Sequence, residues 1–179
     1  MVADMVIKEL EGLSSQGVFG AVKHFPGQGG VSGDSHDGAV TLDKSLEELM
    51  QTELVPFQKA LENGVSFVMV GHISVPQVVG DNTPASLSQM MVSNVLREQL
   101  GYQGIVITDA MNMGAVTGNY TADQAAVMAV NAGVDMILMP QDYETAYNGL
   151  LQAVQDGTIS EERIDESVER IVKVKLQMQ

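Results

Sequence analysis

Short apolar runs are spaced along the chain, and the longer stretches between them carry apolar residues about every 3.6 positions. The runs contain many β-branched residues and lack regular polar alternation, which is typical of strands buried on both faces of a parallel sheet. We therefore predict four strands, at Val18–Val22, Val65–Val70, Ile105–Thr108 and Val134–Met139.

The periodic stretches predict helices that alternate with these strands. Ser45 and Glu48 have the spacing of a capping box, which marks a helix start, and Pro56 predicts a kink or break within the same helix. The helices that the pattern predicts lie at residues 1–15, 45–63, 86–100, 122–132, 143–155 and 160–175.

The order of the elements is a helix, then four strand–helix units, then a final helix. This order predicts an α/β fold in which helices cover a parallel sheet. A complete (β/α)8 barrel of the TIM type needs roughly 250 residues and eight strands. The chain has 179 residues, so we expect a single domain over residues 1–179 that forms half of such a barrel.

Composition excludes several classes of partner. The net charge of −14 argues against nucleic acid and anionic membrane surfaces as partners. No apolar run reaches the roughly 18 residues that a membrane-spanning helix needs. The chain has no cysteine, so it forms no disulfide and no thiolate metal site, and its compartment stays unknown.

A polar, glycine-rich stretch, Lys23–Gly38, follows the first predicted strand and reads as a loop at its end. Within it, Asp34 and His36 stand two residues apart, so in extended backbone their side chains point to the same side. A carboxylate can hold one imidazole nitrogen and leave the other free for proton transfer. The alternative interpretation is a surface loop in which this spacing is accidental.

Two further polar residues end predicted strands. Asp109 follows the third strand, where a carboxylate serves equally well as a nucleophile or as a helix cap. His72 ends the second strand, and we favour a structural hydrogen-bonding role for it over a functional one. Neither a metal site nor a nucleotide cofactor is expected, because the histidine spacings and the glycine run match no short ligand motif.

Three segments together resemble the signature of family 3 glycoside hydrolases, in particular the bacterial β-N-acetylglucosaminidases. They are Lys23–Gly27 (KHFPG), Asp34–His36 (DSH) and Ile107–Ala115 (ITDAMNMGA). The resemblance covers essentially the whole chain and aligns it with the C-terminal half of the family's catalytic barrel. It implies a hydrolase that acts on a carbohydrate, with terminal β-linked N-acetylglucosamine as the expected substrate.

The resemblance also implies a role for each matching residue. Asp109 matches the nucleophile of a retaining mechanism, in which a covalent glycosyl intermediate forms and is then released to water. His36 matches the general acid/base and Asp34 the residue that orients it. Lys23 and His24 match the pair that binds sugar hydroxyls.

The sequence departs from the family pattern at several points. Gln28 stands where the family usually has histidine, and Gly30 stands where aspartate is common. An Asp and an Arg that bind sugar in the family belong to the other half of the barrel and have no match here. Two alternatives stay open, namely a non-catalytic half-barrel fragment or assembly module, and a family 3 glycoside phosphorylase.

A half barrel would leave its first and last strands unpaired on one side. Unpaired strand edges and exposed barrel-facing side chains are unfavourable in water. We therefore expect a homo-oligomer that covers the open face, or a chain that is stable only as part of a longer one. Little or no glycosidase activity is expected from the 179 residues alone.

Overall fold

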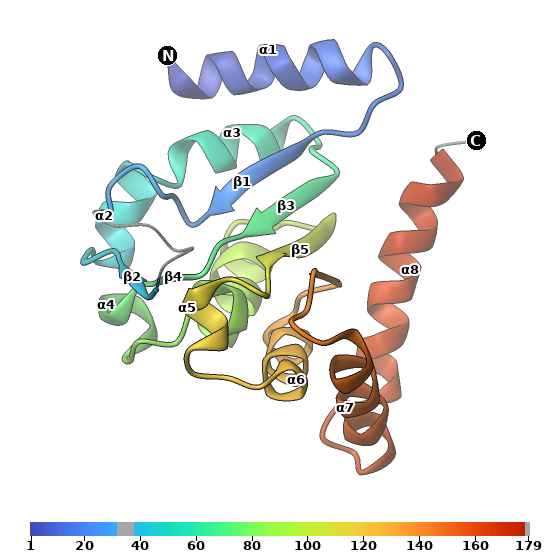
Figure 1. The fold of residues 1–179 in the computed structure, drawn as a ribbon. Helices are drawn as coiled ribbons and strands as arrows, with labels where there is room; N and C mark the ends of the chain where they lie inside the picture. Colours follow the sequence, from blue (N-terminus) through green and yellow to red (C-terminus); the bar gives the residue numbers. More distant parts are fainter. Residues whose placement is uncertain (32–37, 178–179) are drawn as a thin grey trace.

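The computed structural model describes residues 1–31 and 38–177, and a parallel sheet lies at its centre (Figure 1). The strand order is β1-β3-β5-β6, and each neighbouring pair is parallel. The strands are β1 (Ala21–Phe25), β3 (Phe67–Val70), β5 (Ile105–Ala110) and β6 (Met136–Leu138). The predicted α/β fold with four parallel strands is confirmed, and the arrangement is consistent with half of a (β/α)8 barrel.

Helices flank this sheet in the order that the apolar periodicity predicts. Ser45 caps α2 through the capping box with Glu48, and the helix breaks before α3, whose second residue is Pro56. The longer helices are α1 (Val2–Ser14), α2 (Leu46–Gln51), α3 (Val55–Glu62), the π-helix η2 (Met90–Gln99), α6 (Ala122–Ala132), α7 (Tyr143–Gln155) and α8 (Glu161–Gln177). The short ones are α4 (Pro76–Val79), the 3₁₀ turn η1 (Ala85–Leu87) and α5 (Gly114–Thr117).

The first strand lies further along the chain than predicted. It begins at Ala21 rather than Val18 and continues through Lys23 and His24 to Phe25, so the loop starts later. Phe25 is fully buried and packs edge-on against Phe57, with ring centroids 5.4 Å apart. Burial of this ring explains the shift, because it draws the polar Lys23-His24 pair into the strand.

Two details on either side of β3 were not predicted. A second parallel pair joins β2 (Val40–Thr41), which precedes β3, to β4 (Ile73–Ser74), which lies where a loop was expected after β3. The helix predicted from Ser86 begins later, at Met90, because Ser88 provides its first acceptor, to which the Val92 amide donates at 3.0 Å.

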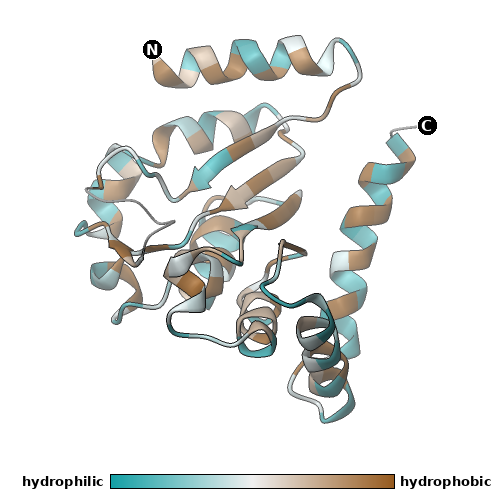
Figure 2. Ribbon diagram, viewed as in Figure 1, coloured by the Kyte–Doolittle hydropathy of each residue, from teal (hydrophilic) through white to brown (hydrophobic). Residues whose placement is uncertain are grey.

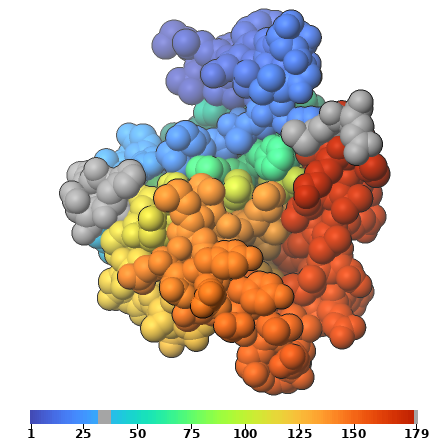
Figure 3. Space-filling model, turned by 45° about the vertical axis from the view of Figure 1, so that its right-hand side comes forward, coloured from blue at the N-terminus to red at the C-terminus, as the bar shows by residue number. Residues whose placement is uncertain are grey.

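The main core lies between the sheet and the helices, and apolar residues fill both facing surfaces (Figure 2). By contrast, α1 buries none of its residues and stands at the top of the molecule (Figure 3).

Within the described residues, β1 and β6 each have one neighbouring strand, so both outer edges of the sheet are open. An exposed apolar stripe at helical spacing runs along α8, formed by Val168, Val172 and Leu176.

A buried carboxylate connects the amino ends of the strands to α8. The Asp135 side chain is fully buried just before β6 and pairs with Arg97 of η2 and with Arg170 of α8, the latter at 3.1 Å. It also accepts hydrogen bonds from the Val106 amide (2.8 Å) and the Ser167 hydroxyl (2.7 Å). These contacts satisfy the buried charge and fix α8 against the sheet.

Candidate active site

Two side chains that the resemblance singles out meet at the carboxyl ends of the strands. His24 of β1 and Asp109 of β5 approach to 3.4 Å between Nε2 and Oδ2. They are 23% and 18% exposed, so both are partly shielded but reachable from solvent. In barrels and open α/β sheets, this end of the strands is where ligands bind and react.

The contact between His24 and Asp109 crosses over the end of β3, which lies between their strands. Gly71 follows β3 there, and a Cβ atom at this position would come within 3.1 Å of the His24 Cβ. The absence of a side chain at Gly71 therefore lets His24 reach across the intervening strand toward Asp109.

Hydrogen bonds fix the end of β5 that carries Asp109. The Asp109 Oδ1 accepts from the Ala110 amide at 2.8 Å. Beside it, the buried Thr108 hydroxyl accepts from the Leu138 amide at 3.0 Å, and the Met111 amide donates to the Leu138 carbonyl at 2.9 Å. The carboxylate thus sits on a strand end that is held by β6.

His72 lies beside this strand end and is almost fully buried, with 1% of its surface exposed. Its Nδ1 lies 2.7 Å from the Ser86 hydroxyl and its Nε2 lies 3.0 Å from the Ala110 carbonyl oxygen. Burial lowers the pKa of His72, which favours the uncharged ring. These contacts agree with the hydrogen-bonding role expected from the sequence.

Of the remaining predicted site residues, Lys23 is the one that the structure describes. Lys23 is on the exposed side of β1 and lines a separate hollow of about 490 Å³ beneath α1. Asp34 and His36 lie outside the described residues, so the acid–base dyad stays a prediction. The searched part of the chain contains no group of three acidic or histidine side chains suited to a metal.

Glu53 is a residue that the sequence analysis missed, and it shapes the glycine-rich loop. Its carboxylate pairs with Lys44 at 2.6 Å. A Cβ at Gly27 would lie 2.6 Å from the Glu53 Cβ, and one at Gly30 would lie 2.8 Å from the Glu53 Oε1. The loop therefore needs glycine at position 27, where φ is +134°, in order to pass over Glu53, whereas at position 30 the end of the flexible Glu53 side chain could move aside.

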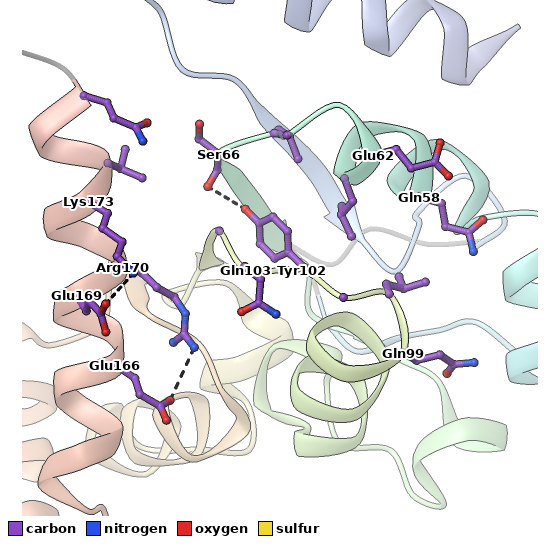
Figure 4. A pocket seen from close by; sticks show the side chains of 18 of the residues that line it. Gln58, Glu62, Ser66, Gln99, Tyr102, Gln103, Glu166, Glu169, Arg170 and Lys173 are labelled. Carbon is purple, nitrogen blue, oxygen red and sulfur yellow. Dashed lines mark hydrogen bonds and ion pairs between the residues drawn. The ribbon is translucent and has the colours of Figure 1, made fainter.

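A larger hollow, of about 880 Å³, lies at the opposite, amino-terminal end of the strands (Figure 4). Its wall includes Tyr102, whose hydroxyl donates to the Ser66 carbonyl at 2.8 Å, and α8 closes it on the far side through Arg170 and Lys173. Burial raises the pKa of Tyr102, so its phenol stays protonated. Because the reacting groups of barrel enzymes stand at the carboxyl ends, this hollow is not the candidate active site.

The comparison with protein families decides which group the chain belongs to. Residues 1–174 match the model described as the glycosyl hydrolase family 3 N terminal domain. The chain belongs to glycoside hydrolase family 3. The match covers nearly all of the chain and agrees with the resemblance carried by the three sequence segments.

Individual relatives agree with this assignment. A solved family 3 β-N-acetylglucosaminidase from Paenibacillus sp. str. FPU-7 superposes with a TM-score of 0.93 at 40% identity, over 96% of this chain and 33% of that one. "Beta-hexosaminidase A" of Pseudoalteromonas piscicida is 28% identical over 99% of this chain and 33% of its own length. "Beta-glucoside phosphorylase BglX" superposes with a TM-score of 0.93 at 28% identity, over 98% of this chain and 33% of that one. This family 3 chain thus spans about a third of the length of these relatives.

Proposed function

We propose that this family 3 chain forms part of the active site of a retaining glycoside hydrolase that removes terminal β-linked N-acetylglucosamine. The observation that carries the proposal is the approach of His24 to Asp109 at the carboxyl edge of the sheet. The names of the relatives provide the substrate class. No helix among the described residues is long and apolar enough to cross a membrane.

In the proposed mechanism the Asp109 carboxylate attacks the anomeric carbon and forms a glycosyl ester. The bond to the leaving oxygen breaks as His36 gives that oxygen a proton, and Asp34 stabilises the imidazolium and orients the ring. Water then attacks the ester while His36 takes up its proton, so the product keeps the β configuration. Lys23 and His24 bind the sugar hydroxyls.

In a complete, assembled barrel, Asp109→Ala and His36→Ala test these roles with a chromogenic N-acetyl-β-glucosaminide. Asp109→Ala removes the nucleophile, so no covalent intermediate forms and turnover is abolished. His36→Ala lowers turnover by about 10²–10⁴-fold, the range for lost acid–base catalysis. The loss is smaller for substrates with good leaving groups, which need less protonation. Equal losses for all leaving groups, or an intermediate trapped on another residue, would contradict the assignment.

A phosphorylase is the second candidate, because BglX has the same fold over this chain. A neutral histidine repels phosphate less than a second carboxylate would, and this makes phosphate a feasible acceptor. Turnover with added inorganic phosphate distinguishes the two chemistries. Free sugar indicates hydrolysis, whereas a sugar 1-phosphate indicates phosphorolysis.

We also propose that the isolated chain associates with itself across its open face. Both β1 and β6 have an unpaired edge within the described residues, and α8 exposes an apolar stripe. A second copy related by a two-fold axis would cover these surfaces. Such a dimer would still lack the sugar-binding groups that we place in the rest of the barrel, so weak activity is expected.

A further inference from the structure

Both ring nitrogens of His72 have a hydrogen-bonding partner, although the proposed mechanism gives this residue no role. It leaves the end of β3, is 1% exposed, and reaches both η1 and the end of β5. A polar ring in this setting is unfavourable unless both nitrogens have partners. Ser86 and Ala110 provide those partners, from two different elements.

The chemistry of these partners determines which nitrogen carries the hydrogen. The Ala110 carbonyl oxygen can only accept, so Nε2 must carry the hydrogen and donate to it at 3.0 Å. In the neutral ring Nδ1 then accepts from the Ser86 hydroxyl at 2.7 Å. The Ala110 carbonyl therefore selects the tautomer, and Ser86 supports it because its hydroxyl can donate to Nδ1.

Ala110 links His72 to Asp109. Its amide donates to the Asp109 carboxylate at 2.8 Å, and its carbonyl accepts from His72. Any rotation of the backbone at Ala110 would therefore alter the hydrogen bond that orients the carboxylate. A neutral His72 also places no positive charge near the contact between His24 and Asp109.

We propose that His72 is a positioning residue, which orients the Asp109 carboxylate through the backbone of Ala110. The inference rests on the proposed function, because it gives Asp109 the part of nucleophile. Small errors in the position of a nucleophile lower its rate strongly, by about 10²-fold for a displacement near 1 Å. The hydrogen bond to Ala110 is the contact that prevents such an error.

Two substitutions separate positioning from bulk packing. His72→Leu introduces an apolar side chain of similar size, which fills the space but cannot donate to Ala110. His72→Gln places an amide N–H where Nε2–H stood and can restore that bond. Ile159→Val is the control, because Ile159 is buried in the separate cluster between α7 and α8 and alters packing away from Asp109.

The first measurement is amide hydrogen exchange in the 179-residue chain. We expect the Ala110 amide to exchange at least about tenfold faster in His72→Leu, relative to the amides within β3, and His72→Gln to restore slow exchange. Ile159→Val should change all slow amides together. Uniform acceleration in His72→Leu would overturn the proposal, because it indicates lost stability rather than lost positioning.

The second measurement is labelling by 5-fluoro-N-acetylglucosaminyl fluoride, read by mass spectrometry. The ester bond to Asp109 forms as the anomeric C–F bond breaks and fluoride leaves. We expect labelling about 10²-fold slower in His72→Leu and within about tenfold of the original rate in His72→Gln. Equal rates in all variants would overturn the positioning role.

The two measurements keep the proposals distinct. If the unsubstituted chain gains its label on a residue other than Asp109, the proposed function is overturned, while the exchange of Ala110 still decides whether His72 positions this strand end. If the chain alone gains no label, which its expected weak activity allows, the exchange of Ala110 decides the positioning role in the same way. If His72→Leu does not fold, the ¹⁵N shifts of the unsubstituted chain decide. A hydrogen on Nε2 supports the proposal, and a hydrogen on Nδ1 alone overturns it.

Discussion

At the scale of single residues, the buried ring of His72 makes the stability of the chain depend on pH. Burial lowers its pKa in the folded chain below the ordinary value of about 6.5. Below that pH the unfolded chain binds a proton that the folded chain does not bind. The contribution of the neutral His72 to the free energy of unfolding is therefore fully present above about pH 6.5. It falls as the pH decreases, by at most about 1.4 kcal/mol per pH unit for this one group.

We expect the free energy of unfolding to decrease between pH 7.5 and about pH 5, and to decrease less in His72→Gln. Urea unfolding across this range measures the difference. His24 and His36 are present in both proteins, so they cancel in the comparison. Exposed carboxylates with a lowered pKa, such as Asp142, act in a lower pH range. Parallel curves for the two proteins would show that His72 titrates normally.

At the scale of elements, Asp135 determines whether α8 stays attached to the sheet. Asp135→Ala leaves Arg97 and Arg170 without their shared carboxylate, and the Val106 amide loses its acceptor. Removing one partner of a buried ion pair costs about 3–5 kcal/mol. We expect a loss of this size in urea unfolding.

Asp165→Ala is the matched control for Asp135→Ala. It removes the same charge from an exposed position on α8 and should change the free energy of unfolding by no more than about 0.5 kcal/mol. Similar losses in the two variants would show that the buried cluster contributes no more than surface charge.

The elements also show what could be predicted from the sequence. The bounds of α6 and α7 match the prediction, because periodic apolar residues and local caps determine both helices. The start of β1 was wrong because the burial of Phe25 depends on Phe57, which is distant in the sequence. Local patterns also missed Asp135 and Glu53, because their partners come from other elements.

The candidate site was predictable only where local patterns determine it. Asp109 and His24 could be placed at strand ends from the order of strands and helices, and the structure brings them together. The bond from His72 to Ala110 spans 38 residues, so no local pattern could indicate it. Asp34 and His36 remain predictions that rest on the family signature.

At the scale of the whole molecule, the open face predicts association that depends on salt. The net charge of −14 opposes contact between two copies, and added salt screens this repulsion. We expect sedimentation to show more dimer at 0.5 M salt than at 0.05 M. A monomer at all salt concentrations would refute the proposed association.

Val172→Glu tests whether the stripe on α8 takes part. Val172 is 45% exposed at the middle of the stripe, so a charge there should weaken association at least about tenfold without unfolding the chain. Gln155→Glu adds the same charge at an exposed position on α7 and should leave association unchanged. If the two variants associate equally, another surface forms the contact.

The order of strands in the sheet has a consequence for how the chain folds during synthesis. The strands lie side by side in the sheet in the same order as along the chain. Each strand–helix unit can therefore dock on the preceding one as soon as it leaves the ribosome. Asp135 changes this for the unit that contains β6, because its carboxylate is incompletely paired until α8 brings Arg170 and Ser167. Helix α8 therefore completes a charge cluster in the interior, and a nascent chain that has not yet reached α8 carries a buried ion short of partners.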